Sequence, residues 1–198
     1  MVKTKLIYGT AFIVILGIAF GISEFLARKT VDPAGFDIGA PFSLISQTGK
    51  ATDQTLFIGS PTALFFGFTH CPDICPTTLS NLTLWQDEIG AAADNLQIVF
   101  VTVDPVRDTP EILSAYLGYF DDSIIGLTGT EANLEKMLSD WGIYRKAFVS
   151  GAGELSYDHT ATIFLLNSQG RLAGTISPQE SDEIAVAKLK NLVTASVK

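Results

Sequence analysis

Two uninterrupted apolar runs restrict most strongly what this 198-residue chain can fold into. The first run is Ala63–Phe68, and the second, Leu96–Val103, reads LQIVFVTV. Continuous apolar residues, rather than alternating apolar and polar ones, are typical of strands that are buried on both faces of a sheet. A helical pattern from about Pro76 to Ile89 separates the two runs. The sequence therefore predicts a sheet with buried strands connected by helices.

Beyond these runs the elements keep alternating and then change character. Thr109-Pro110-Glu111 predicts a helix start, because an N-cap threonine, a proline in the first turn and an early acid each favour one. The other expected elements are a helix to about Tyr119, a strand at Ile124–Thr128, a helix from Thr130 to about Trp141, strands at Thr162–Asn167 and Arg171–Ile176 around a Ser168-Gln169-Gly170 turn, a final helix opened by the capping box Ser177-Pro178-Gln179-Glu180, and an N-terminal strand at Phe42–Ser46. The order β-α-β-α-β-α-β-β-α predicts an α/β fold, a thioredoxin-like sandwich with a central mixed sheet flanked by helices.

The composition excludes two classes of protein. Hydrophobic residues make up 47% of the chain and charged residues 17%, which excludes an intrinsically disordered protein. The chain has 21 acidic residues against 13 Lys and Arg, a formal net charge of −8. A nucleic-acid partner requires a basic face, so no nucleic-acid partner is expected.

The N-terminus predicts a membrane anchor. Leu6–Ser23 contains no charged residue, and as a helix it would span roughly 27 Å of a hydrocarbon core roughly 30 Å thick. A cleaved signal peptide is the alternative, but its apolar region is usually about 7–15 residues, and no A-x-A-like cleavage site precedes Arg28. We expect residues 1–28 to be a cytoplasmic tail and a single transmembrane helix, 29–41 a linker, and 42–198 the folded domain. The short tail and the absence of an organellar presequence favour a bacterial inner-membrane protein whose domain faces the oxidising periplasm.

The only two cysteines, Cys71 and Cys75, follow the first buried strand at the start of a helix. Ligands of open α/β sheets usually bind at this edge. A spacing of four places both thiols on one helical face, close enough to chelate one ion or to form a disulfide. The helix N-terminus favours the thiolate, which is both a nucleophile and a metal ligand. The alternative is a pair of buried small side chains or a static disulfide.

The chain has two histidines, and we expect them to differ in role. His159 directly precedes the Thr162–Asn167 strand, and in a thioredoxin-like sheet the loop entering that strand faces the cysteine turn. His70 adjoins the cysteine pair in sequence, and we expect it to support the site without binding an ion. Two thiolates and one imidazole suit copper as Cu(I) or Cu(II). Structural zinc would need a fourth protein ligand; His70 leaves that alternative disfavoured but open.

Two further segments bear on the site. No proline occurs between Pro110 and Pro178. The cis-proline that usually faces the cysteines of thioredoxin-type oxidoreductases is therefore missing, which leaves room for a metal. Asp104 follows the second buried strand, and we expect it to line the site. Arg107 is expected to pair with Asp108 or with an acidic partner protein.

Three segments together resemble the SCO (SenC-type) family: Gly67-Phe-Thr-His-Cys-Pro-Asp-Ile-Cys-Pro76, Asp104-Pro-Val-Arg-Asp-Thr-Pro110, and Asp158-His-Thr160 before a strand. The resemblance covers the chain from about Phe42 to the last helix. It implies a membrane-anchored thioredoxin-fold protein that binds one copper ion through Cys71, Cys75 and His159. It also implies delivery of copper to, or thiol reduction at, the dinuclear copper centre of cytochrome c oxidase subunit II.

Three functional hypotheses follow. The first is a copper metallochaperone, which is not an enzyme. The second is a thiol-disulfide oxidoreductase that reduces the copper-ligating cysteines of the partner, with Cys71 as the attacking thiolate and Cys75 as the resolving thiol. The third, a peroxide-reducing enzyme of the broader thioredoxin fold, would require measurable peroxide turnover.

Overall fold

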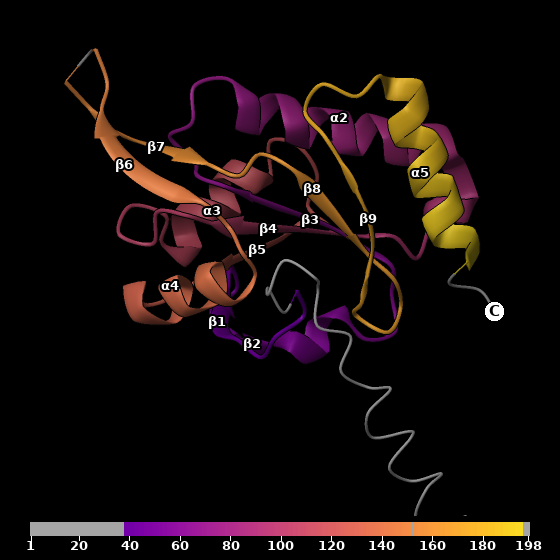
Figure 1. Ribbon diagram of the computed structural model, residues 1–198, viewed down its shortest axis with the longest axis horizontal. Coiled ribbons are helices and arrows are strands. Elements are labelled where there is room, and N and C mark those ends of the chain that lie inside the picture. The colour runs from indigo at the N-terminus through magenta and orange to yellow at the C-terminus, as the bar shows by residue number, and fades with distance from the viewer. Residues whose placement is uncertain (1–37, 152, 196–198) are drawn as a thin grey trace, which may run out of the picture. The chain divides into compact units, whose positions relative to one another are not determined.

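A computed structural model describes residues 38–151 and 153–195 of the chain, which form a mixed seven-stranded sheet covered by helices on both faces (Figure 1). The strands are β1 (Ser43–Ser46), β2 (Ala51–Asp53), β3 (Thr62–Gly67), β4 (Gln97–Thr102), β5 (Ile125–Thr128), β8 (Ile163–Leu166) and β9 (Leu172–Ile176). The helices are α2 (Ile74–Ile89), α3 (Pro110–Leu117), α4 (Glu131–Asp140) and α5 (Asp182–Ala195), with short 3-10 turns η1 (Gln54–Phe57) and η2 (Gly90–Ala93). The spatial order of the sheet is β2-β1-β5-β4-β3-β8-β9.

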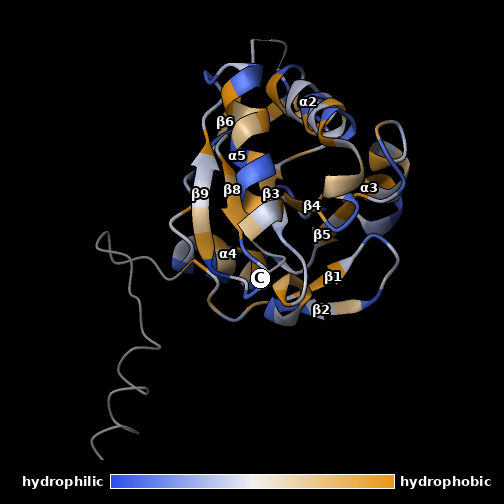
Figure 2. Ribbon diagram, turned by 90° about the vertical axis from the view of Figure 1, so that its right-hand side faces the viewer, coloured by the Kyte–Doolittle hydropathy of each residue, from blue (hydrophilic) through white to orange (hydrophobic). Residues whose placement is uncertain are grey.

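The two apolar runs become the central strands, as the sequence predicts. β3 and β4 are parallel neighbours, with Phe65 opposite Phe100, and β4 is also parallel to β5. β8 lies antiparallel on the other side of β3, with Leu64 opposite Phe164. Figure 2 shows the hydrophobic colours concentrated on these strands, between the helices. The mixed sheet flanked by helices confirms the predicted sandwich.

The helices divide between the two faces of the sheet. Helices α2 and α5 lie side by side on one face (Figure 1), and Tyr116 of α3 packs against Phe100 on that same face. The opposite face is closed by Trp141, the residue after α4, whose ring packs against Phe42, Phe57 and Phe66. The Trp141 indole N–H donates a hydrogen bond to the backbone carbonyl oxygen of Ala40, 3.3 Å away. The side of the sheet that carries α2 and α3 is the side on which the cysteines lie.

The last helix begins later than the sequence predicts. The box Ser177-Pro178-Gln179-Glu180 was expected to open α5, but these residues form a turn and α5 starts at Asp182. The carboxylate of Glu180 accepts from the backbone N–H of Ser177, as in a capping box, but it also accepts from Lys188 at 2.7 Å. The Ser177 hydroxyl donates to Gln179 instead of accepting from the Glu180 backbone N–H. Half of the box is therefore formed, and the prediction of the helix start was wrong.

A separate two-stranded hairpin was not predicted. Strands β6 (Arg145–Val149) and β7 (Leu155–His159) pair with each other and extend away from the main sheet (Figure 1). His159 is therefore the last residue of a strand rather than part of a loop. The hairpin places this histidine four residues before β8, beside the central strand β3.

The membrane anchor expected at residues 1–28 and most of the expected linker lie outside the described residues. Within residues 38–151 and 153–195, no helix is long and apolar enough to cross a membrane.

Candidate metal centre

Both cysteines lie where β3 leads into α2. The chain leaves the sheet after Gly67, turns with the backbone N–H of Cys71 donating to the Phe68 carbonyl at 3.1 Å, and enters α2 at Ile74. The N-cap residue of α2, Asp73, makes no side-chain capping bond. Instead the Cys71 sulfur accepts from the backbone N–H of Cys75 at 3.4 Å. A sulfur that receives a free N–H of a helix N-terminus is stabilised as the thiolate.

Gly67 makes room for the second sulfur. A Cβ atom at this position would lie 2.9 Å from Cys75 Sγ and 2.7 Å from a ring carbon of Phe100, both too close for ordinary contact. A glycine inside a strand often marks such a close approach. Cys75 can therefore pack fully buried against the strand backbone.

His159, at the end of β7, lies beside the thiols, with its Nε2 atom 3.6 Å from Cys75 Sγ. Its Nδ1 atom lies 3.0 Å from the carbonyl oxygen of Thr160. Because a carbonyl only accepts hydrogen bonds, this contact places the proton on Nδ1 and leaves the lone pair of Nε2 facing the thiols. The imidazole ring is held edge-on against Phe65 and Phe68, with centroids 6.3 and 5.8 Å away.

The arrangement fits three-point binding of a metal ion. The ligand atoms of Cys71, Cys75 and His159 all lie within 4.8 Å of one another. An ion bound at about 2.0–2.3 Å from sulfur and nitrogen ligands would hold them roughly 4 Å apart, which is close to the observed spacing of these atoms. In the part of the chain that the structure describes, these three side chains form the one such cluster of His, Cys, Asp and Glu. His70 is exposed and contacts the Thr69 hydroxyl at 3.0 Å, so it does not complete a Cys2His2 set.

The two thiols differ in acidity. A hydrogen bond from Cys75 lowers the pKa of Cys71 to about 4 against the opposing effect of burial, and contacts with His159 and nearby backbone N–H groups lower it further. The same hydrogen bond, together with its own burial, raises the pKa of Cys75 well above its usual range. At neutral pH the pair is one thiolate and one thiol that share a proton. A metal ion that binds both sulfurs would release this proton.

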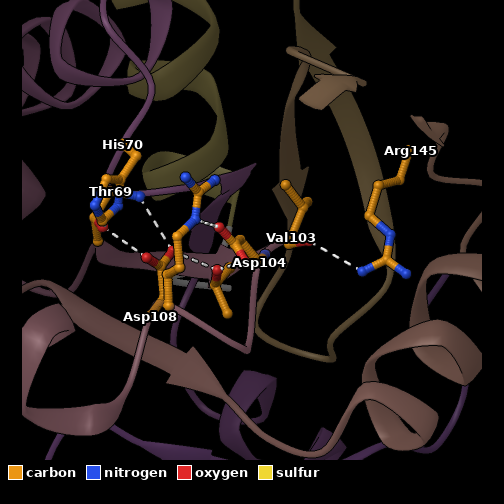
Figure 3. A network of polar contacts seen from close by, with 8 residues as sticks. Thr69, His70, Val103, Asp104, Asp108 and Arg145 are labelled. Carbon is orange, nitrogen blue, oxygen red and sulfur yellow. Dashed lines mark hydrogen bonds and ion pairs between the residues drawn. The ribbon is translucent and has the colours of Figure 1, made fainter. Parts of the chain in front are cut away.

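Asp108 fixes the loop that carries the cysteines. This fully buried carboxylate accepts hydrogen bonds from the Thr69 backbone N–H at 3.1 Å, the Thr69 hydroxyl at 2.6 Å and the Thr102 hydroxyl at 2.5 Å (Figure 3). The residue two positions before Cys71 is thereby tied to the end of β4. Burial raises the pKa of Asp108, and the three hydrogen bonds oppose that shift. Sequence reasoning considered Asp108 only as one of two alternative partners of Arg107 and missed its role in holding this loop.

Asp104 and Arg107 form their own pair beside the site. Asp104 is fully buried, and its carboxylate accepts from Nε of Arg107. The Arg107 guanidinium lies 5.9 Å from the centroid of Phe68, the ring that also contacts His159. Arg107 therefore pairs with Asp104 rather than with Asp108, the partner within the chain that the sequence suggested. Asp104 was expected to line the site, but its link to the candidate ligands is indirect: it pairs with Arg107, which lies against Phe68, and Phe68 contacts His159.

Comparisons with known proteins identify relatives over most of the chain. The family model described as SCO1/SenC matches residues 31–194. The mitochondrial protein SCO2 of Saccharomyces cerevisiae is 32% identical over 164 residues, 81% of this chain and 54% of that protein. The chain therefore spans about half the length of that relative.

Solved structures of similar proteins agree with the fold, and some of them hold copper. The structure of Bradyrhizobium japonicum ScoI with copper bound is 38% identical, with a TM-score of 0.71, covering 79% of this chain and 99% of that one. The crystal structure of yeast Sco1 with copper bound is 30% identical, with a TM-score of 0.73, covering 80% and 90%. Two structural neighbours at this level of identity therefore hold copper.

Proposed function

The chain belongs to the SCO1/SenC family, and on this premise we propose that it binds one copper ion through Cys71, Cys75 and His159 and delivers it to a partner protein. The observation that carries the proposal is the convergence of the three ligand atoms within 4.8 Å. Thiolates are soft ligands that suit Cu(I), and imidazole with thiolate suits Cu(II). The copper-bound relatives support copper over zinc.

The side chains of the site have distinct roles in binding. Cys71 is ionised at neutral pH and offers the first sulfur. Cys75 becomes a ligand by giving up its proton, and His159 offers the Nε2 lone pair that its bond to Thr160 leaves free. Cys75 is fully buried while Cys71 is 9% exposed, so an acceptor approaches from the Cys71 side. Delivery then proceeds by ligand exchange, in which acceptor ligands replace those of this chain one at a time.

A copper titration of the full-length reduced chain tests the ligand assignment. His159→Ala should weaken Cu(II) binding by at least about tenfold, because an imidazole ligand is lost. His70→Ala is the matched control and should bind as the wild type does, since His70 lies outside the cluster. Equal Cu(II) affinity of wild type and His159→Ala would refute the assignment.

The partner and location proposed are those of the family resemblance. The acceptor is the dinuclear copper centre of cytochrome c oxidase subunit II. Residues 1–28 anchor the chain in the bacterial inner membrane, 29–41 form a linker, and 42–198 form the copper-binding domain in the periplasm. Deletion of the chain should lower the copper content of subunit II. Removal of residues 2–28 should release the domain from alkali-washed membranes; continued retention would contradict the anchor.

A thiol-disulfide oxidoreductase is the second candidate, favoured by the unequal acidity of the two thiols. The Cys71 thiolate would attack a partner disulfide, forming a mixed disulfide and expelling one partner thiolate. Cys75 would then lose its proton and attack Cys71, closing a Cys71–Cys75 disulfide and releasing the second partner thiol. Two electrons pass to the partner. Cys75→Ser should trap the mixed disulfide while His159→Ala stays active; no trapped partner would count against this function.

A further inference from the structure

Arg145 supplies most of the hydrogen bonds between the side chains of the hairpin that carries His159 and the rest of the domain. In the described residues, β6 and β7 form ladder hydrogen bonds only with each other, in a sheet separate from the main one. Arg145 stands directly opposite His159 in this ladder. Among the described residues of β6 and β7, only the side chains of Arg145 and His159 form hydrogen bonds with the rest of the domain.

Arg145 contacts two separate parts of that body. Its Nη1 donates to the carbonyl oxygen of Val103, just after β4, at 3.0 Å (Figure 3). Its Nη2 donates to the carboxylate of Glu131 and, at 2.7 Å, to that of Glu135, both on α4. The Arg145 side chain is only 14% exposed, so these charge-assisted bonds are partly shielded from water. The planar guanidinium presents its N–H groups in a rigid fork that reaches these acceptors together, whereas lysine ends in one compact, flexible ammonium.

A series of aromatic contacts also links the Arg145 guanidinium to His159. It lies 5.9 Å from the centroid of Tyr157, two residues before His159. Tyr157 packs edge-on against Phe68 at 5.6 Å, and Phe68 packs edge-on against the His159 imidazole at 5.8 Å. Arg145 thus fixes β7 through its neighbour in the ladder and through this stack of rings.

We propose that Arg145 is a positioning residue of the copper site, which sets the place of His159 Nε2 relative to the two sulfurs without contacting the ion. This inference rests on the proposed copper binding. Cu(II) depends on the imidazole more than Cu(I), which two thiolates suit. Displacing the hairpin therefore weakens Cu(II) binding and leaves Cu(I) binding close to that of the wild type.

The test measures Cu(I) and Cu(II) affinities of the reduced full-length chain by competition with chelators. Arg145→Gln should weaken Cu(II) at least about tenfold, as loss of a group that orients a ligand commonly does, and change Cu(I) less than about threefold. Arg145→Lys should lie between it and the wild type. Lys146→Gln, which removes a charge from the next, exposed residue, is the control and should change neither affinity. Equal loss of Cu(I) and Cu(II) in Arg145→Gln would overturn the positioning role.

A double variant tests whether Arg145 acts through His159. In a His159→Ala background, Arg145→Gln should cause no further loss of Cu(II) affinity, because the group it positions is gone. A full additional loss would overturn the inference. Wild-type binding equal to that of His159→Ala would instead overturn the ligand assignment, and the positioning role with it.

A second variant keeps the test open if Arg145→Gln fails to fold, as judged by circular dichroism. The Glu131→Gln, Glu135→Gln double variant removes the carboxylates that Arg145 contacts on α4 and should also lose Cu(II) affinity selectively. Unchanged Cu(II) affinity in this double variant would count against the inference.

Discussion

Gly67→Ala adds a single methyl group to the strand against which Cys75 packs, and its effect can be worked out from the structure. The new Cβ would lie 2.9 Å from Cys75 Sγ, 2.7 Å from Phe100 and 3.0 Å from Phe65, where ordinary contact begins near 3.4 Å. All three neighbours are buried and tightly packed. The sulfur and the rings must therefore move apart by about half an ångström or more.

This displacement predicts two measurable losses. Overpacking of a core typically costs about 1–3 kcal/mol, which lowers Tm by roughly 2–12 °C for a domain of this size. A metal site tolerates ligand displacements of only about 0.2 Å, so Cu(II) affinity should fall by about tenfold or more. Calorimetry of the metal-free reduced chain gives the first quantity and a chelator competition gives the second.

Gly174→Ala is the matched control. Gly174 lies in β9, and a Cβ there would meet its nearest neighbour, Leu165, at 4.0 Å, which is ordinary contact. This variant should bind copper as the wild type does and gain about 0.4–1 kcal/mol from the less flexible unfolded chain. A Gly67→Ala protein with the Tm and copper affinity of the wild type would show that the close approach of Cys75 to the strand does not constrain the site.

Three other experiments test the acidity of Cys71, the anchoring of the cysteine loop by Asp108, and the packing of Trp141 in the core. Iodoacetamide should alkylate Cys71 at a nearly constant rate from pH 6 to 8, because a pKa of about 4 leaves it ionised above that value; a rate rising about tenfold per pH unit would contradict the lowered pKa. Asp108→Ala should lower the free energy of unfolding by about 1–3 kcal/mol in urea titrations, since the donors of Thr69 lose their acceptor; an unchanged midpoint would contradict this. Trp141→Ala should cost about 3–5 kcal/mol in the same assay, because this 1% exposed ring joins the core on its face of the sheet; a loss under about 1 kcal/mol would refute that role.

The central strands and the meeting of the candidate ligands were predictable because their signals are local or topological. Ala63–Phe68 is apolar throughout, a pattern typical of strands that are buried on both faces of a sheet. The cysteines follow it at the edge where ligands of such sheets bind, and His159 was placed by its position just before a later strand.

The hairpin and its contacts were not predictable in the same way. In β6 every residue after Arg145 is exposed, so no alternation of apolar and polar residues marks the strand. The glycines Gly151 and Gly153 between β6 and β7 were the available turn signal. The partner of Arg107 depends on how the turn after β4 folds back, which residue spacing does not determine. Gly67 could have been recognised, because a glycine inside a strand pattern suggests a close approach.

The order of strands in the sheet also means that the three candidate ligands come together only when two segments far apart in sequence have paired. Cys71 and Cys75 follow β3, but His159 reaches them only after β8 has inserted beside β3, bringing Phe164 opposite Leu64. Pairing between segments so far apart in sequence is among the slowest steps of folding. An incompletely folded chain therefore offers two sulfurs without the nitrogen, a set that suits Cu(I) and not Cu(II). Under the proposed ligand set, a chain that binds Cu(II) tightly is one in which β8 is already paired with β3.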